Sequence, residues 1–139
     1  MTRLGGFFYA DFSGETMSDK DIEQEIQTKG LTAPRVTPQR INDVISEEYY
    51  FSGAVGCGHP YVAIERSSPL HLLTFCVLVL KNGFTVTGES ACASPENFDA
   101  DIGRKVAREN AISKIWMLEG YLLKQELHNN KNLIELLHS

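Results

Sequence analysis

Three groups of side chains in this sequence could do chemistry, but none matches an established catalytic or metal-binding pattern. The segment Gly88-Glu89-Ser90-Ala91-Cys92 is similar to the turn that exposes a nucleophilic serine, but its last position is cysteine rather than glycine. Cys57-Gly58-His59 offers two metal ligands without the spacing of a zinc site. A cluster of acids is as typical of helix capping as of acid-base or divalent-metal chemistry, and it consists of Glu89, Glu96, Asp99 and Asp101. We expect no catalytic residue, no metal and no cofactor.

Positive side chains between Arg104 and Lys124 indicate a fourth possibility, which is anion binding. This segment has five positive and two negative residues in a chain whose formal net charge is −5. Arg104 and Arg108 are four residues apart, so on a helix both lie on one face and need an anion or a carboxylate nearby. Lys105 can pair with acids one turn away. The sequence leaves open whether this face is only solvated or binds an anion.

Length and composition indicate one globular domain. The chain has 139 residues, and 42% of them are hydrophobic, which is enough for a core. Its longest apolar run, Leu70–Leu80, is shorter than the ~20 residues that span a bilayer, so we expect no membrane association. The negative charge argues against a generic nucleic-acid binder. The cysteines favour reduced thiols in a cytosol, and they are Cys57, Cys76 and Cys92.

The first third of the chain predicts two helices. We expect residues 1–16 to be a disordered extension upstream of a natural start at Met17, and residues 17–36 to be a helical arm that begins at Ser18 and ends at Gly30. Thr37-Pro38 is typical of a helix N-terminus, and the apolar spacing that follows predicts a helix over 37–50. A single α+β domain would then occupy residues 37–126.

A β-hairpin follows a loop and a short strand expected at Tyr61–Glu65. Asn82-Gly83 predicts a two-residue turn, which places Val79 opposite Val86. One face then forms the core and consists of Phe75, Val77, Val79, Phe84 and Val86. The other face carries Cys76, Leu78, Leu80, Thr85 and Thr87. Because leucines should not face water, we expect the N-terminal segment or a second subunit to cover this second face, which predicts a homodimer or partner surface.

A long apolar stripe from Ile102 to Leu123 predicts a C-terminal helix that Gly120 bends or interrupts. Residues 127–139 would form a tail or a short helix. The predicted fold class is α+β in the order α-β-β-β-α, with an antiparallel sheet of two or three strands packed on the long C-terminal helix.

Long segments of the chain closely resemble a family of small phage and prophage proteins. The segments are Gly30–Pro38, Leu73–Asp99, Asp101–Arg108 and Ile115-Trp116. The family is named for the gene 49 product of phage N4 and the gene 66 product of phage Sf6, and the resemblance extends over residues 17 to 126. It implies a phage accessory protein in the host bacterial cytoplasm. It brings no enzymatic role, and proteins of this kind often bind a host factor or counter bacterial defence.

A second resemblance, in topology and two motifs, is to double-stranded-RNA-binding domains. Pro69–Val79 is similar to the turn-and-strand motif of that family, and Arg104–Arg108 is similar to its basic helix start. The resemblance implies that His71 enters the minor groove, while Arg104, Lys105 and Arg108 contact phosphates.

These observations favour a non-catalytic phage protein that binds a host bacterial protein. The alternative is an anion binder that holds double-stranded RNA or a small nucleotide signal at the basic helix start.

Overall fold

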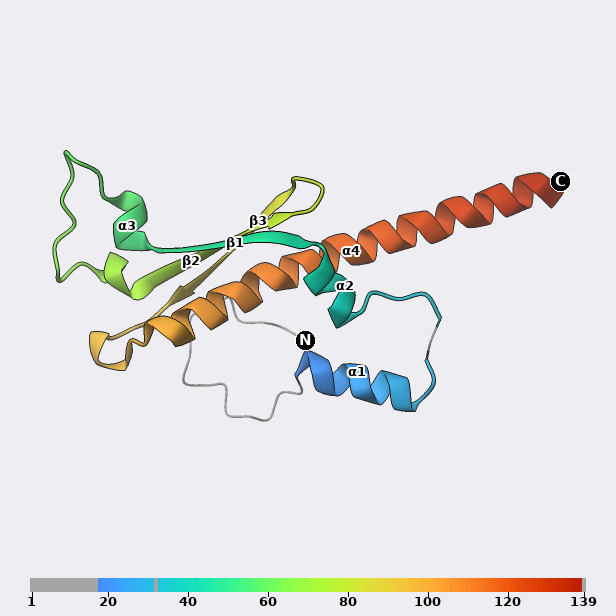
Figure 1. The fold of residues 1–139 in the computed structure, drawn as a ribbon, viewed down its shortest axis with the longest axis horizontal. Helices are drawn as coiled ribbons and strands as arrows, with labels where there is room; N and C mark the ends of the chain where they lie inside the picture. The colour runs from blue at the N-terminus through green and yellow to red at the C-terminus, as the bar shows by residue number, and fades with distance from the viewer. Residues whose placement is uncertain (1–17, 32, 139) are drawn as a thin grey trace.

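Three antiparallel strands lie along one side of a long helix, in the computed structural model of the chain (Figure 1). The structure describes residues 18–31 and 33–138, so the extension expected at residues 1–16 lies outside the described residues. The elements are α1 (Asp19–Thr28), α2 (Pro38–Asp43), β1 (Ile45–Ser52), α3 (Gly53–Cys57), the 3₁₀ helix η1 (Pro69–Leu72), β2 (Leu73–Leu80), β3 (Thr85–Ala91), the 3₁₀ helix η2 (Pro95–Asn97) and α4 (Ala100–His138). The predicted α+β class, with its sheet on a long C-terminal helix, is confirmed.

Small residues bring the sheet and α4 into close contact. A Cβ atom on Gly88 of β3 would lie 2.2 Å from the carbonyl oxygen of Ala107 and 2.3 Å from the backbone nitrogen of Ala111. The side chain of Asn110 donates a hydrogen bond of 2.8 Å to the carbonyl oxygen of Glu89. The strand therefore lies almost directly on the helix backbone. Around this crossing is the core, which contains Ile41, Val44, Cys76, Leu78, Leu80, Val86, Ala107, Ala111, Ile112 and Ile115.

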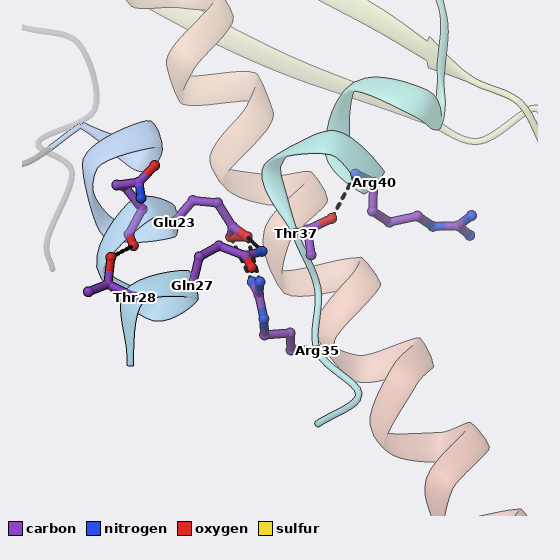
Figure 2. Close-up of polar contacts among 7 residues, drawn as sticks. Glu23, Gln27, Thr28, Arg35, Thr37 and Arg40 are labelled. Atoms are coloured by element: carbon purple, nitrogen blue, oxygen red, sulfur yellow. Dashed lines mark hydrogen bonds and ion pairs between the residues drawn. The ribbon is translucent and has the colours of Figure 1, made fainter. Parts of the chain in front are cut away.

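The helix predicted over 37–50 is wrong in its second half. Thr37 caps α2 as expected, because its hydroxyl accepts a hydrogen bond of 3.1 Å from the backbone N–H of Arg40 (Figure 2). The helix ends at Asp43, and Ile45–Ser52 forms β1 beside β2. The strand expected at Tyr61–Glu65 is also wrong, since that region has only an isolated bridge at Val62. A central strand as apolar as β2 needs partners at both edges, and the aromatic-rich β1 supplies one.

The hairpin turn has three residues rather than the predicted two. The backbone N–H of Leu80 donates to the carbonyl oxygen of Phe84 at 2.8 Å, and that of Gly83 donates to Leu80 at 2.9 Å. Gly83 has a φ of +87°, as expected where a turn ends in a glycine bulge. Leu78 therefore pairs with Val86, and Val79 with Thr85. A shift of one residue moves each side chain of one strand to the other face relative to its partner strand.

This shift exchanges the two predicted faces of β2, whereas β3 keeps Val86 in the core as predicted. Phe75, Val77 and Val79, which the sequence predicts as core, lie on the side away from α4, and Phe84 beside the turn is exposed. Cys76, Leu78 and Leu80 are buried beneath α4 of the same chain, together with Val86. Because α4 covers these side chains, they are not available to a second subunit, and the predicted partner surface at these three residues is wrong. Burial also raises the pKa of the Cys76 thiol, which favours its neutral form in the core.

Helix α1 is held to the rest of the chain mainly by polar contacts. It has the capping box expected at Ser18 and Asp21, and it has no buried residue. The guanidinium of Arg35 donates two hydrogen bonds, of 2.7 and 2.5 Å, to the carboxylate of Glu23 (Figure 2). These bonds lower the pKa of Glu23 to about 2. The contact fixes α1 beside the segment that leads into α2.

Helix α4 is continuous for 39 residues and extends well beyond the sheet (Figure 1). The interruption expected at Gly120 is absent, and the residues expected as a tail or short helix continue α4 as far as His138. Its fully buried residues lie between Gly103 and Ile115. The first half of α4 therefore belongs to the domain core, while the second half projects from it.

Candidate functional site

The sheet face opposite α4 carries aromatic and aliphatic side chains that are partly or largely exposed. Strand pairing places side chains of this face in three rows. The rows are Phe51, Phe75 and Glu89, then Tyr49, Val77 and Thr87, then Glu47, Val79 and Thr85. Figure 1 shows the sheet with α4 on its other side. We call these nine residues the open face.

Aromatic side chains give the open face exposed apolar area that a protein partner could bury. The rings of Phe51 and Phe75 are stacked, with centroids 5.2 Å apart and an interplanar angle of 18°. Phe51 is 37% exposed and Tyr49 is 54% exposed, while Phe75 and Val77 are half-buried. Stacked aromatic rings at a surface offer apolar area with little rotamer entropy to lose, which suits the centre of a protein–protein interface.

Acidic side chains lie at two corners of the open face. Glu47 accepts a hydrogen bond of 2.7 Å from the phenol of Tyr49, and this carboxylate raises the pKa of Tyr49. Glu89 lies in the row that holds the stacked rings. The face is therefore apolar in its middle strand and negative at its margins, which repels phosphate and favours a cationic border on a partner.

The predicted partner residues are divided between the two sides of the sheet. Thr85 and Thr87 lie on the open face and are exposed. Cys76, Leu78 and Leu80 lie on the other side in the core. The sequence does not predict Tyr49 and Phe51 as surface residues of a sheet, because Tyr49 falls in the helix expected over 37–50 and Phe51 in the loop expected after it. The signal that could have found them is the run of aromatic and β-branched residues after Val44.

Arg108, one of the predicted anion-binding residues, is occupied by a carboxylate of the same chain. Its guanidinium donates two hydrogen bonds, of 3.0 and 2.8 Å, to the carboxylate of Glu48 on β1. This pairing lowers the pKa of Glu48 and raises that of Arg108. The phenol of Tyr50 donates a further bond of 3.2 Å to Glu48. The arrangement ties an edge strand to α4.

The other predicted anion-binding residues do not converge on a shared site either. Arg104 pairs with Asp101 one turn earlier on α4. Lys105 is exposed on the same helix. His71 lies in η1, and its Nε2 atom is 2.9 Å from the carbonyl oxygen of Glu65. The structure thus places a carboxylate beside each arginine, Asp101 from the same helix and Glu48 from β1.

The described residues contain no group of three or more metal-ligating side chains that could hold an ion. The three cysteines are free, with Cys57 exposed and Cys76 buried. His59 uses Nδ1 to accept a hydrogen bond of 3.1 Å from the backbone N–H of Tyr61. In the described part of the chain, no helix is long and apolar enough to cross a membrane.

A comparison with protein-family models identifies the family of the chain. The family model described as Phage protein (N4 Gp49/phage Sf6 gene 66) matches residues 36–127. The chain belongs to this family. The match covers α2, the whole sheet and α4 as far as Leu127, so this phage protein shares with its family the elements that build the open face. No curated protein and no solved structure matched the chain.

Proposed function

We propose that this phage protein is a non-catalytic accessory protein that binds a host bacterial protein through its open face, in the host cytoplasm, and thereby counters bacterial defence. The observation that supports it is the apolar centre of the open face, with its stacked Phe51 and Phe75. Contiguous exposed apolar surface of this kind marks a site of protein association. Membership in a phage family supplies the host context.

The chemistry of the open face specifies the kind of partner. Val77 and Val79 on the central strand offer a flat apolar strip, and Glu47 and Glu89 border it. A matching partner presents exposed aliphatic or aromatic side chains with lysines or arginines around them. The acidic border then speeds association and selects among partners, while the apolar strip supplies most of the affinity.

The experiment compares capture of host proteins by the full chain and by open-face variants. Val77→Lys places a charge at the centre of the open face, and Tyr49→Ser removes an exposed ring. Tyr61→Ser is the matched control, because Tyr61 is exposed on a loop away from the sheet. We expect a host protein that is captured by the wild type and by Tyr61→Ser, and lost with the two open-face variants.

The melting temperature of each variant shows whether a loss of binding comes from a loss of folded structure. A plating assay then tests whether binding to the host protein counters defence. Expression of the wild type in a host with an active defence should raise the plating efficiency of a restricted phage, and Val77→Lys should not. Equal capture by Val77→Lys and the wild type would overturn the proposal.

The anion-binding alternative remains a prediction with its own test. Its residues are Arg104, Lys105 and Arg108 with His71, and the carboxylates that pair with both arginines compete with any phosphate. Binding of labelled double-stranded RNA should be measured against salt concentration for the wild type and for Arg104→Glu/Arg108→Glu. Salt-sensitive binding that the double variant loses would support this alternative.

A further inference from the structure

The second half of α4 has an unusual surface for a helix that projects from a domain. Every residue from Lys124 to His138 is exposed. This stretch nevertheless contains five large apolar side chains, which are Leu127, Leu133, Ile134, Leu136 and Leu137. Leu137 is 74% exposed and Ile134 is 55% exposed. A helix that projects about 22 Å into water needs polar residues on all sides unless a partner covers one of them.

Three of these five side chains have the spacing of a coiled coil, while Leu133 and Leu136 lie outside it. Leu123, Leu127, Asn130, Ile134 and Leu137 are separated alternately by four and three residues. This is the alternation of a and d positions in a heptad repeat, with Leu127 and Ile134 at a and Leu123, Asn130 and Leu137 at d. These five residues form one stripe along the helix, which we call the seam. Leu122 and Leu136 lie at c positions, outside the seam.

The charges beside the seam favour a parallel pair of identical helices. In this heptad frame Glu119 and Glu126 occupy g positions, while Lys124 and Lys131 occupy e positions. In a parallel dimer each g residue faces the e residue five positions later on the other helix, so Glu126 faces Lys131 of the second copy. An antiparallel dimer would instead place glutamate near glutamate and lysine near lysine. Glu119 already pairs with Arg40 of its own chain, so Glu126 and Lys131 carry this argument.

We propose that a second copy of this chain covers the seam, and that residues 123–138 form a parallel two-stranded coiled coil. Ile134 at a with Leu137 at d is the combination that favours two strands. Asn130 can hydrogen-bond to its own counterpart across the two-fold axis, which fixes the register. This surface is separate from the open face, so the proposal does not depend on host-protein binding.

Sedimentation equilibrium of the full chain tests the association. We expect twice the mass of one chain at high protein concentration and dissociation on dilution. Leu127→Lys places a charge in the seam and should weaken dimerisation about 100-fold or more. Leu122→Lys is the matched control, because it makes the same change at an exposed leucine outside the seam. A monomer at every concentration, or equal weakening by both substitutions, would overturn the proposal.

Two further variants test the orientation of the helices. Glu126→Lys and Lys131→Glu should each weaken the dimer, and the double variant should restore it, because each pair then has opposite charges again. Leu137→Cys should give a disulfide-linked dimer on mild oxidation, above the background that the wild-type cysteines give. Failure of the double variant to restore association, together with no added cross-link, would rule out the parallel arrangement. Val77→Lys should remain dimeric, which keeps this test separate from that of the open face.

Discussion

Gly88 lies at a point of the fold that has no room for a side chain. A Cβ atom there would overlap backbone atoms of Ala107 and Ala111, and backbone cannot move aside as a flexible side chain can. We expect Gly88→Ala to lower the free energy of unfolding by about 3 kcal/mol. Gly120→Ala is the control, because nothing lies within 4 Å of its added Cβ. That change should stabilise the helix by up to about 1 kcal/mol. Urea unfolding measures both, and the same sign for the two would contradict this account of the crossing.

Glu48 should make the free energy of unfolding depend on pH in the acidic range. Hydrogen bonds from Arg108 lower the pKa of Glu48 from its ordinary value of 4.5. A carboxyl group whose pKa is lower in the folded state stabilises the fold above its ordinary pKa, and that contribution disappears as the pH falls through the folded-state pKa. Glu48→Gln should therefore lower the melting temperature at pH 7, and its difference from the wild type should shrink at pH 3. A difference that is constant with pH would contradict this role.

At the residue scale, sequence reasoning predicted local caps better than long-range pairs. Ser18, Asp21 and Thr37 make the predicted capping contacts, because each involves atoms three residues apart. The sequence also indicates that Arg104 and Arg108 need an anion or a carboxylate nearby. It could not identify Glu48 as the partner of Arg108, because the two are 60 positions apart and meet only when β1 joins the sheet.

At the scale of elements, the hairpin register decides which side chains are core. We expect Leu78→Ala to cost about 3 kcal/mol, since Leu78 is fully buried under α4. Val79→Ala, one position along and half-buried on the open face, should cost about 1 kcal/mol or less. Chemical unfolding of the two variants compares neighbours on opposite faces of one strand. A larger loss for Val79→Ala would mean that the open face is covered in the native protein.

The sequence predicted that a hairpin turns at Asn82-Gly83 but not how many residues the turn holds. Both the two-residue and the three-residue turn place Gly83 where a positive φ is needed, so the same pair fits either. With either turn β3 presents Val86 and Gly88 to α4, and only the three-residue turn places Leu78 of β2 on that same side. Likewise, Ile41, Val44 and Ile45 have helical spacing. The chain nevertheless forms a strand after Val44, because its backbone there pairs with the edge of β2 that β3 leaves free. Tertiary contacts override local preference in both places.

At the scale of the whole molecule, α4 joins a buried part and an exposed part. Its residues between Gly103 and Ile115 pack on the sheet, while those from Lys124 onward are exposed in one chain. The apolar stripe predicted from Ile102 to Leu123 includes the packed half, but its members Ile102 and Leu122 are exposed. The sequence predicts only a tail or a short helix over residues 127–139, because that segment is mostly polar, whereas α4 continues to His138. The molecule thus combines a sheet domain, which carries the open face, with a helical extension that carries the seam.

Hydrogen exchange should resolve these two halves within one helix. Backbone amides in residues 103–115 lie in the core and should exchange slowest, at a rate independent of protein concentration. Amides from Lys124 to His138 should exchange fast in dilute protein, because a projecting helical end opens locally without unfolding the domain. If the seam pairs, their protection should rise with concentration while the loop at residues 59–68 remains fast. Exchange measured by mass spectrometry at two concentrations, for the wild type and Leu127→Lys, makes the comparison. If Leu127→Lys retained the concentration-dependent protection, the contact between copies would lie outside the seam. Uniform protection along α4 in dilute protein would contradict the division of this helix into two halves.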